Sequence, residues 1–213
     1  MFKLYREPQP EEMIVIGADP ADGGSDYCAA VAKSKKQADS FMVFHAHLDS
    51  AQFGYELYKM AKFINRYTKN WATIGVERNT GSATINVLQT LNYPQLFRMP
   101  DLGVELPNTD LNRIGWITNT QTRPKMLDDL ALALKQGATR IYDEETIKEL
   151  FSFIRNPRNG RPEAAAGSKD DLVFAEAIAW QLYSLVRGHS KSEWGQIINQ
   201  FPKQDLFKKD GSY

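Results

Sequence analysis

The sequence predicts an α/β domain in which helices flank a mixed β-sheet. Three observations lead to this prediction. Short apolar runs of strand-like composition come first, apolar residues then recur at helical spacing, and one further strand-like run is followed by helices. A length of 213 residues suits one domain with a core of its own.

The N-terminal part is expected to form three antiparallel strands. Residues 13–19 (MIVIGAD) are a short apolar run, and the glycine-rich segment 20–26 that follows is typical of a turn. Residues 27–34 and 40–48 are two more strand-like runs, separated by the polar stretch KKQAD. Because the connections are short, we expect an antiparallel meander.

A helix, a strand and a second helix are predicted next. Ser50 is expected to cap a helix with apolar residues at helical spacing, namely Phe53, Leu57, Met60, Ala61 and Ile64. Residues 73–77 (TIGVE) form a strand-like run, and residues 82–91 are typical of a helix. Residues 94–118 are expected to form a hairpin or an extended loop.

The C-terminal half is predicted to be mainly helical. Thr122 and Pro124 open one helix, and a shorter helix covers residues 143–153. Residues 156–167 are expected to form a loop, and Ser168 begins the last helix. We therefore expect parallel strands and covering helices to follow the antiparallel start.

The predicted domain spans residues 13–187. Residues 1–12, which are polar and contain two prolines, are expected to be a linker or tail, and residues 188–213 a C-terminal tail. No run approaches the roughly 18 apolar residues of a membrane helix, so no membrane partner is expected. Lys+Arg and Asp+Glu both number 26, so the net charge does not identify a nucleic-acid partner.

Two acidic residues stand at the ends of predicted strands. Asp19 ends the first strand and Glu77 ends TIGVE, and each comes two residues after a glycine. Because side chains alternate along a strand, each acid lies on the same face as its glycine. A carboxylate at the end of an apolar strand costs free energy unless a partner compensates its charge. A divalent cation is one such partner.

Asp170 and Asp171 are expected in the first turn of the last helix. Neighbouring helix positions point about 100° apart, so one of them can face the strand acids while the other reaches sideways. Carboxylates from two strands and one helix can hold two hard cations. Two ions roughly 3.5–4 Å apart can activate a water molecule and stabilise the leaving oxygen of a phosphodiester.

Each acid also has a structural interpretation. Asp19 precedes a turn, where aspartate is common, and Glu77 suits the surface of an edge strand. Ser168 and Asp171 match an S-x-x-D capping box. The helix dipole also favours acidic residues near the start of a helix. The functional interpretation depends on all the acids occurring in suitable elements and in order.

Three segments carry a resemblance to a known family. IGADPADGGSD, IGVERN and GSKDDLVFAEAIAW resemble the acidic motifs of the nuclease domain of tailed-bacteriophage terminase large subunits, over roughly residues 13–186. The resemblance implies a ribonuclease H-like fold, with Asp19, Glu77, Asp170 and Asp171 as catalytic residues and ligands of two Mg²⁺ or Mn²⁺ ions. It also implies an endonuclease that cleaves double-stranded viral concatemers during genome packaging, in the cytoplasm of the bacterial host.

The same resemblance implies partners. The sequence has no G-x-x-x-x-G-K-[ST] phosphate loop, so the ATPase motor domain of such a protein is expected elsewhere, together with a portal and a small terminase subunit. Two alternatives stay open. One is a ribonuclease H-fold ATPase of the actin or sugar-kinase type, and the other is an inactive DNA-binding or docking module.

Five basic residues are candidates for phosphate contacts, with solvated surface positions as the alternative: Arg123, Lys125, Arg155, Arg158 and Arg161. His45 and His47 lie two apart on one strand and could bind a metal, but a structural role is favoured because no cysteine or third histidine is nearby. Trp116 and Cys28 are interpreted as core residues.

Overall fold

The structure, a computed structural model, describes residues 2–21, 27–100, 113–155, 162–164 and 169–186. Its main sheet has six strands in the order β1-β4-β3-β2-β5, with β6 on β4. Their bounds are β1 Lys3–Leu4, β2 Ile14–Asp19, β3 Cys28–Ser34, β4 Asp39–Ala46, β5 Thr73–Val76 and β6 Arg140–Ile141. Strands β2, β3 and β4 are antiparallel, whereas β5 pairs with β2 in parallel. The predicted antiparallel start followed by parallel pairing is confirmed.

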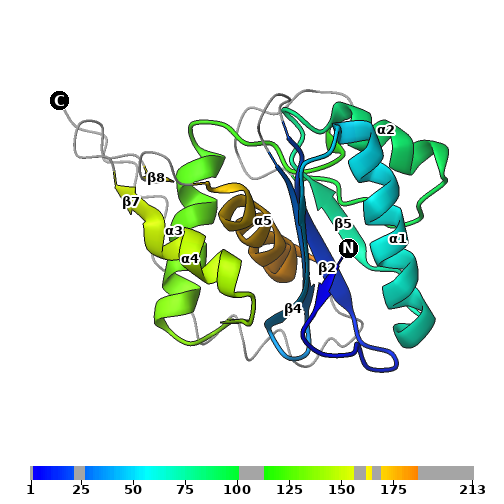
Figure 1. The fold of residues 1–213 in the computed structure, drawn as a ribbon, viewed down its shortest axis with the longest axis horizontal. Coiled ribbons are helices and arrows are strands. Elements are labelled where there is room, and N and C mark those ends of the chain that lie inside the picture. Colours follow the sequence, from blue (N-terminus) through cyan, green and yellow to red (C-terminus); the bar gives the residue numbers. More distant parts are fainter. Residues whose placement is uncertain (1, 22–26, 101–112, 156–161, 165–168, 187–213) are drawn as a thin grey trace, which may run out of the picture.

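Helices cover both faces of this sheet (Figure 1). Their bounds are α1 Ser50–Thr68, α2 Ser82–Thr90, α3 Thr122–Lys135, α4 Glu144–Ser152 and α5 Asp171–Leu185. Helices α1 and α2 lie on one face; α5 lies on the other, and α3 and α4 pack against it from outside. A second, two-stranded sheet pairs β7, Phe153–Arg155, with β8, Pro162–Ala164. Among the helices of the described residues, none combines the length and apolarity that crossing a membrane requires.

Alternation along β2 separates the two faces of the sheet. Ile16 and Ala18 pack into the core on the α1 side, whereas Val15 packs into the core on the α5 side. Gly17 also faces α5, where an added Cβ would lie 2.2 Å from the carbonyl oxygen of Ala175. The absence of a side chain at Gly17 therefore lets helix α5 lie close to the sheet.

The residue that caps helix α1 lies one position before the predicted one. Asp49, not Ser50, is the N-cap, and its carboxylate accepts hydrogen bonds from the backbone N–H groups of Ala51 and Gln52. Ser50 is the first helical residue, and its hydroxyl donates to the carbonyl of Ala21. Both side chains can cap a helix, and the tertiary contact with Ala21 decides between them.

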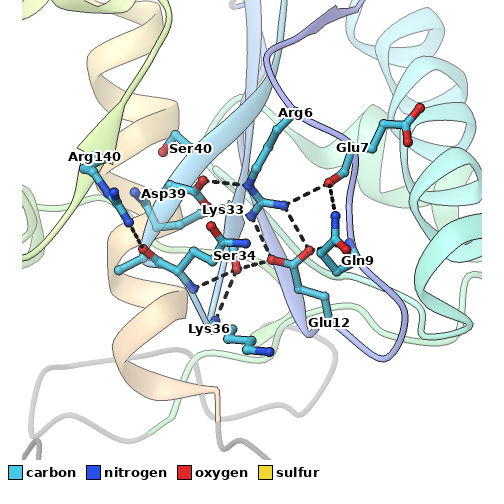
Figure 2. A network of polar contacts seen from close by, with 12 residues as sticks. Arg6, Glu7, Gln9, Glu12, Lys33, Ser34, Lys36, Asp39, Ser40 and Arg140 are labelled. Carbon is cyan, nitrogen blue, oxygen red and sulfur yellow. Dashed lines mark hydrogen bonds and ion pairs between the residues drawn. The ribbon is translucent and has the colours of Figure 1, made fainter.

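The described N-terminal residues pack on the sheet rather than extending away from it. Strand β1 pairs with β4, and Arg6 lies 2.7 Å from both Glu12 and Asp39, whose side chains are fully buried (Figure 2). Part of the segment 1–12, expected to be a linker or tail, is thus fixed to the domain by an ion-pair cluster. The boundaries at residues 13 and 187 stay predictions.

Candidate metal centre

Asp19 and Glu77 lie side by side at the ends of two neighbouring strands. Gly17 and Gly75 are register partners in the parallel pair of β2 and β5. Glu77 directly follows β5, and its backbone N–H donates a 2.7 Å hydrogen bond to the carbonyl of Ala18. Because side chains alternate, both acids project from the face that carries the two glycines, which is the face covered by α5.

The same row continues across two more strands. Asp19 is the register partner of Ala29 on β3, and Ala29 is the partner of His45 on β4. Register partners point to the same face of a sheet, so Glu77, Asp19 and His45 form one transverse row. The small side chain of Ala29 fills the position between Asp19 and His45.

Helix α5 begins above this row. Asp170 is its N-cap residue but makes no capping hydrogen bond with its side chain, and Asp171 is the first helical residue. Glu149 of α4 supplies the cap instead: its Oε2 atom accepts a 2.9 Å hydrogen bond from the backbone N–H of Leu172. Ser168 of the suggested capping box lies outside the described residues.

Burial and the neighbouring acids both act on the pKa of Asp19. Burial raises the pKa of Asp19 well above its ordinary value, and the negative charges of Glu77, Asp171, Asp170 and Glu149 raise it further. Asp19 nevertheless keeps partial access to solvent. The structure therefore brings together the four acids that the sequence analysis singled out, and adds Glu149.

Glu77 is held in place by its own loop. Its side chain is almost fully buried, and its Oε2 atom accepts a hydrogen bond of 3.1 Å from the backbone N–H of Thr80. Among the described residues, neither Glu77 nor Asp19 forms an ion pair with a basic side chain. Carboxylate oxygens that converge without a counter-charge form a donor set suited to a hard divalent cation.

Two further residues border the site: Glu149, which the sequence analysis missed, and His45, for which it favoured a structural role. The Nε2 atom of His45 lies 3.7 Å from Oδ2 of Asp171, and its Nδ1 atom lies 3.0 Å from Oε1 of Glu145. One ligand atom each of His45, Glu149 and Asp171 lies within 4.8 Å of the others, a spacing that could hold a metal ion. The favoured structural role of His45 therefore does not describe its whole environment.

These two residues left unequal signals in the sequence. Glu149 lies three residues after Thr146 and four before Phe153, on the inward stripe of a predicted helix, where an acid is unexpected. The signal from His45 was only its spacing from His47, because its neighbourhood depends on the register of three strands.

The candidate DNA-contacting residues fall into three groups. The guanidinium of Arg123 lies 3.9 Å from Asp170 and 4.9 Å from the ring centroid of Phe174, so it borders the site. Lys125 forms a 2.7 Å ion pair with Asp129 within its own helix. Arg155 belongs to β7, while Arg158 and Arg161 lie outside the described residues.

Two core assignments are confirmed. Trp116 is 1% exposed and packs with Phe97, and Cys28 is fully buried. The flanks of the predicted hairpin at 94–118 also pair, because Arg98 bridges Ile114 in antiparallel orientation.

No protein-family model matches the sequence, and no curated protein does. Solved structures do match. The large terminase nuclease of the thermophilic phage G20c with bound magnesium has a TM-score of 0.65 at 16% identity, covering 86% of this chain and 87% of that one. The large terminase nuclease domain of Thermus phage P74-26 has a TM-score of 0.64 at 16% identity, with 89% of each chain covered.

A viral relative outside the phages is similar too. The human cytomegalovirus terminase nuclease domain has a TM-score of 0.54 at 14% identity, covering 81% of this chain and 83% of that one. Structures of the G20c nuclease with bound cobalt and with bound zinc also match. This chain has the mixed α/β, ribonuclease H-like fold of the large-terminase nuclease domains.

Proposed function

We propose that this chain is a metal-dependent endonuclease that hydrolyses phosphodiester bonds of double-stranded DNA. One observation carries the proposal: Asp19, Glu77, Asp170 and Asp171 converge on one end of the sheet, where Asp19 and Glu77 lack a basic partner among the described residues. The fold, shared with nucleases of which one binds magnesium, cobalt and zinc, supports it.

In this proposal the four carboxylates hold two divalent cations, Mg²⁺ or Mn²⁺. Bound ions would lower the pKa of a water molecule and offset the charge that develops on the phosphate oxygens. The chain's own task is to fix the ligands. Thr80 orients Glu77, and Glu149 caps α5 so that Asp170 and Asp171 do not have to supply that cap.

The substrate would lie along the end of the sheet that carries Asp19 and Glu77. Arg123, next to Asp170, is placed to contact a phosphate, with Lys125 in the same turn of α3 and Arg155, Arg158 and Arg161 as further candidates. As a terminase nuclease, the chain would cut viral concatemers in the cytoplasm of the bacterial host. It would work with an ATPase motor, a portal and a small terminase subunit.

Cleavage of supercoiled plasmid tests the proposal. We expect nicked and linear products with Mg²⁺ or Mn²⁺ and none with a chelator. Asp19→Asn should reduce cleavage to background, because the amide carries no charge to hold a cation. Glu56→Gln, on helix α1 across the sheet, is the matched control and should cut as the wild type does.

Other outcomes would favour the alternatives. An Asp19→Asn protein that cuts normally contradicts the proposal. Plasmid that is retarded in a gel but stays uncut with Mn²⁺ would indicate an inactive DNA-binding module. Binding of ATP in a calorimetric titration, without cleavage, would indicate the ATPase alternative.

A further inference from the structure

We infer that the chain carries a cation position with a nitrogen ligand, formed by His45 of β4, Glu149 of α4 and Asp171 of α5. One donor atom of each residue lies within 4.8 Å of the other two. Metal–ligand bonds are about 2.0–2.2 Å long, so two ligands of one ion lie about 3 Å apart when adjacent and about 4.2 Å apart when opposite. The three side chains therefore need only small movements to enclose an ion.

The orientation of His45 supports this inference independently of the acids. Its side chain is 3% exposed, and within the described part of the chain its Nε2 atom has no hydrogen-bond partner. That atom points toward Asp171, which is too distant, at 3.7 Å, for a hydrogen bond. A buried nitrogen without a partner, next to a carboxylate, is a position that a cation would satisfy.

A carboxylate behind the imidazole fixes its direction. Glu145 lies 3.0 Å from Nδ1 of His45 and is itself held by Lys3, whose Nζ atom lies 2.6 Å from it. Metal-binding histidines ordinarily donate their second ring N–H to such a carboxylate, which leaves the other nitrogen free for the ion. Lys3, Glu145 and His45 thus form a chain that ends at the inferred site.

Glu149 can serve the helix and the ion together. Its Oε2 atom accepts from the backbone of α5, and the carboxylate has a second oxygen for an ion. The negative charge of Glu149 also reaches Asp19, so the inferred position adjoins the site of the proposed function. Asp171 would be a ligand shared between the two.

The ligand chemistry indicates which ions this position selects. Imidazole nitrogen suits Mn²⁺, Co²⁺ and Zn²⁺ better than Mg²⁺, which strongly prefers oxygen. We therefore expect His45 to shift the metal preference of the chain toward transition metals. The catalytic use of this ion rests on the proposed function, whereas its binding does not.

Calorimetric titration of the full chain with MnCl₂ and with MgCl₂ tests the inference without DNA. His45→Gln should weaken Mn²⁺ binding at one position by roughly tenfold or more and affect Mg²⁺ much less. His47→Gln, just past the end of β4, is the matched control and should bind both ions like the wild type. Glu149→Gln keeps an oxygen to cap α5 and should also weaken Mn²⁺ binding, which provides a second variant if His45→Gln does not fold.

Wild-type Mn²⁺ affinity in either folded variant would overturn the inference. In that case His45 is an ordinary bridge between Glu145 and Asp171. Plasmid cleavage by the wild type and Asp19→Asn separates this result from failure of the proposed function. Asp19-dependent cleavage with unchanged Mn²⁺ binding in His45→Gln refutes only the metal position, whereas His45-dependent binding without cleavage refutes only the nuclease.

Discussion

The sheet face under helix α5 carries buried charge at both ends, but only one end pairs that charge with an opposite one. At one end, Lys33 and Glu176 are fully buried and form a 2.7 Å ion pair, and Ser40 and Thr139 hydrogen-bond to its two partners. At the other end, Asp19 and Glu77 meet further carboxylates and have no basic partner among the described residues. The first end is neutralised within the chain, whereas Asp19 and Glu77 at the second end have no such counter-charge among the described residues, which suits the cation of the proposed function.

This contrast separates structural from functional buried charge. Arg6, Glu12 and Asp39 repeat the first pattern beside the Lys33 end, where each buried carboxylate contacts the guanidinium (Figure 2). Natural chains rarely keep buried carboxylates uncompensated unless a function requires them. Substitutions at the two ends should therefore change stability with opposite signs.

The largest effect is expected at the end of the sheet that carries the Lys33–Glu176 ion pair. Lys33→Met leaves Glu176 buried without its counter-charge and should lower the free energy of unfolding by about 3–5 kcal/mol. The double variant Lys33→Met, Glu176→Leu should recover most of this loss, because it removes both charges. Urea unfolding of the three proteins provides the measurement. If Lys33→Met were as stable as the wild type, Lys33 would not be needed to offset the buried charge of Glu176.

A smaller effect of opposite sign is expected at the end that carries Asp19 and Glu77. In chelator, Asp19→Asn should raise the free energy of unfolding by about 1–2 kcal/mol, since it removes one of several repelling carboxylates. Added Mn²⁺ should stabilise the wild type more than the variant. Thermal unfolding with and without Mn²⁺ measures both differences. Destabilisation by Asp19→Asn in chelator would place this acid with the compensated charges instead.

The smallest effect is a pH dependence. Burial raises the pKa of Glu149 from its ordinary 4.5 to about 7, so the folded protein binds the proton more tightly than the unfolded chain does. Its contribution to stability in chelator is therefore lost as pH rises from about 4.5 to 7. Burial lowers the pKa of His45, but nearby Asp171 and Glu145 raise it by more, so His45 changes stability in the same direction.

Unfolding of the wild type and Glu149→Gln in chelator between pH 4.5 and 8 isolates this contribution. The variant should show the shallower decline. Mn²⁺ should oppose the decline in the wild type, because the ion competes with protons for the same ligands. Parallel pH profiles for the two proteins would show that Glu149 does not titrate in this range.

Local pattern predicted most of the elements. Strands β2 to β5 and the five helices of the described residues appear within a few residues of their expected positions. The two-residue strands β1 and β6 were not predicted, because pairs such as Lys3–Leu4 contain no periodicity and form only where an existing strand edge accepts them. The cap of α1 was also misassigned, since a tertiary contact of Ser50 decides it, and the role of Glu149 at the start of α5 depends on the docking of two helices.

The sequence by itself determined which face of each strand carries an acid. Side-chain alternation places Asp19 with Gly17 and Glu77 with Gly75, whatever the neighbouring strands are. Tertiary structure alone decided that His45 stands in the same row and that Glu149 caps α5 beside it. Strand register and helix docking depend on contacts between residues far apart in the chain, and a register shift of one residue would turn His45 to the opposite face.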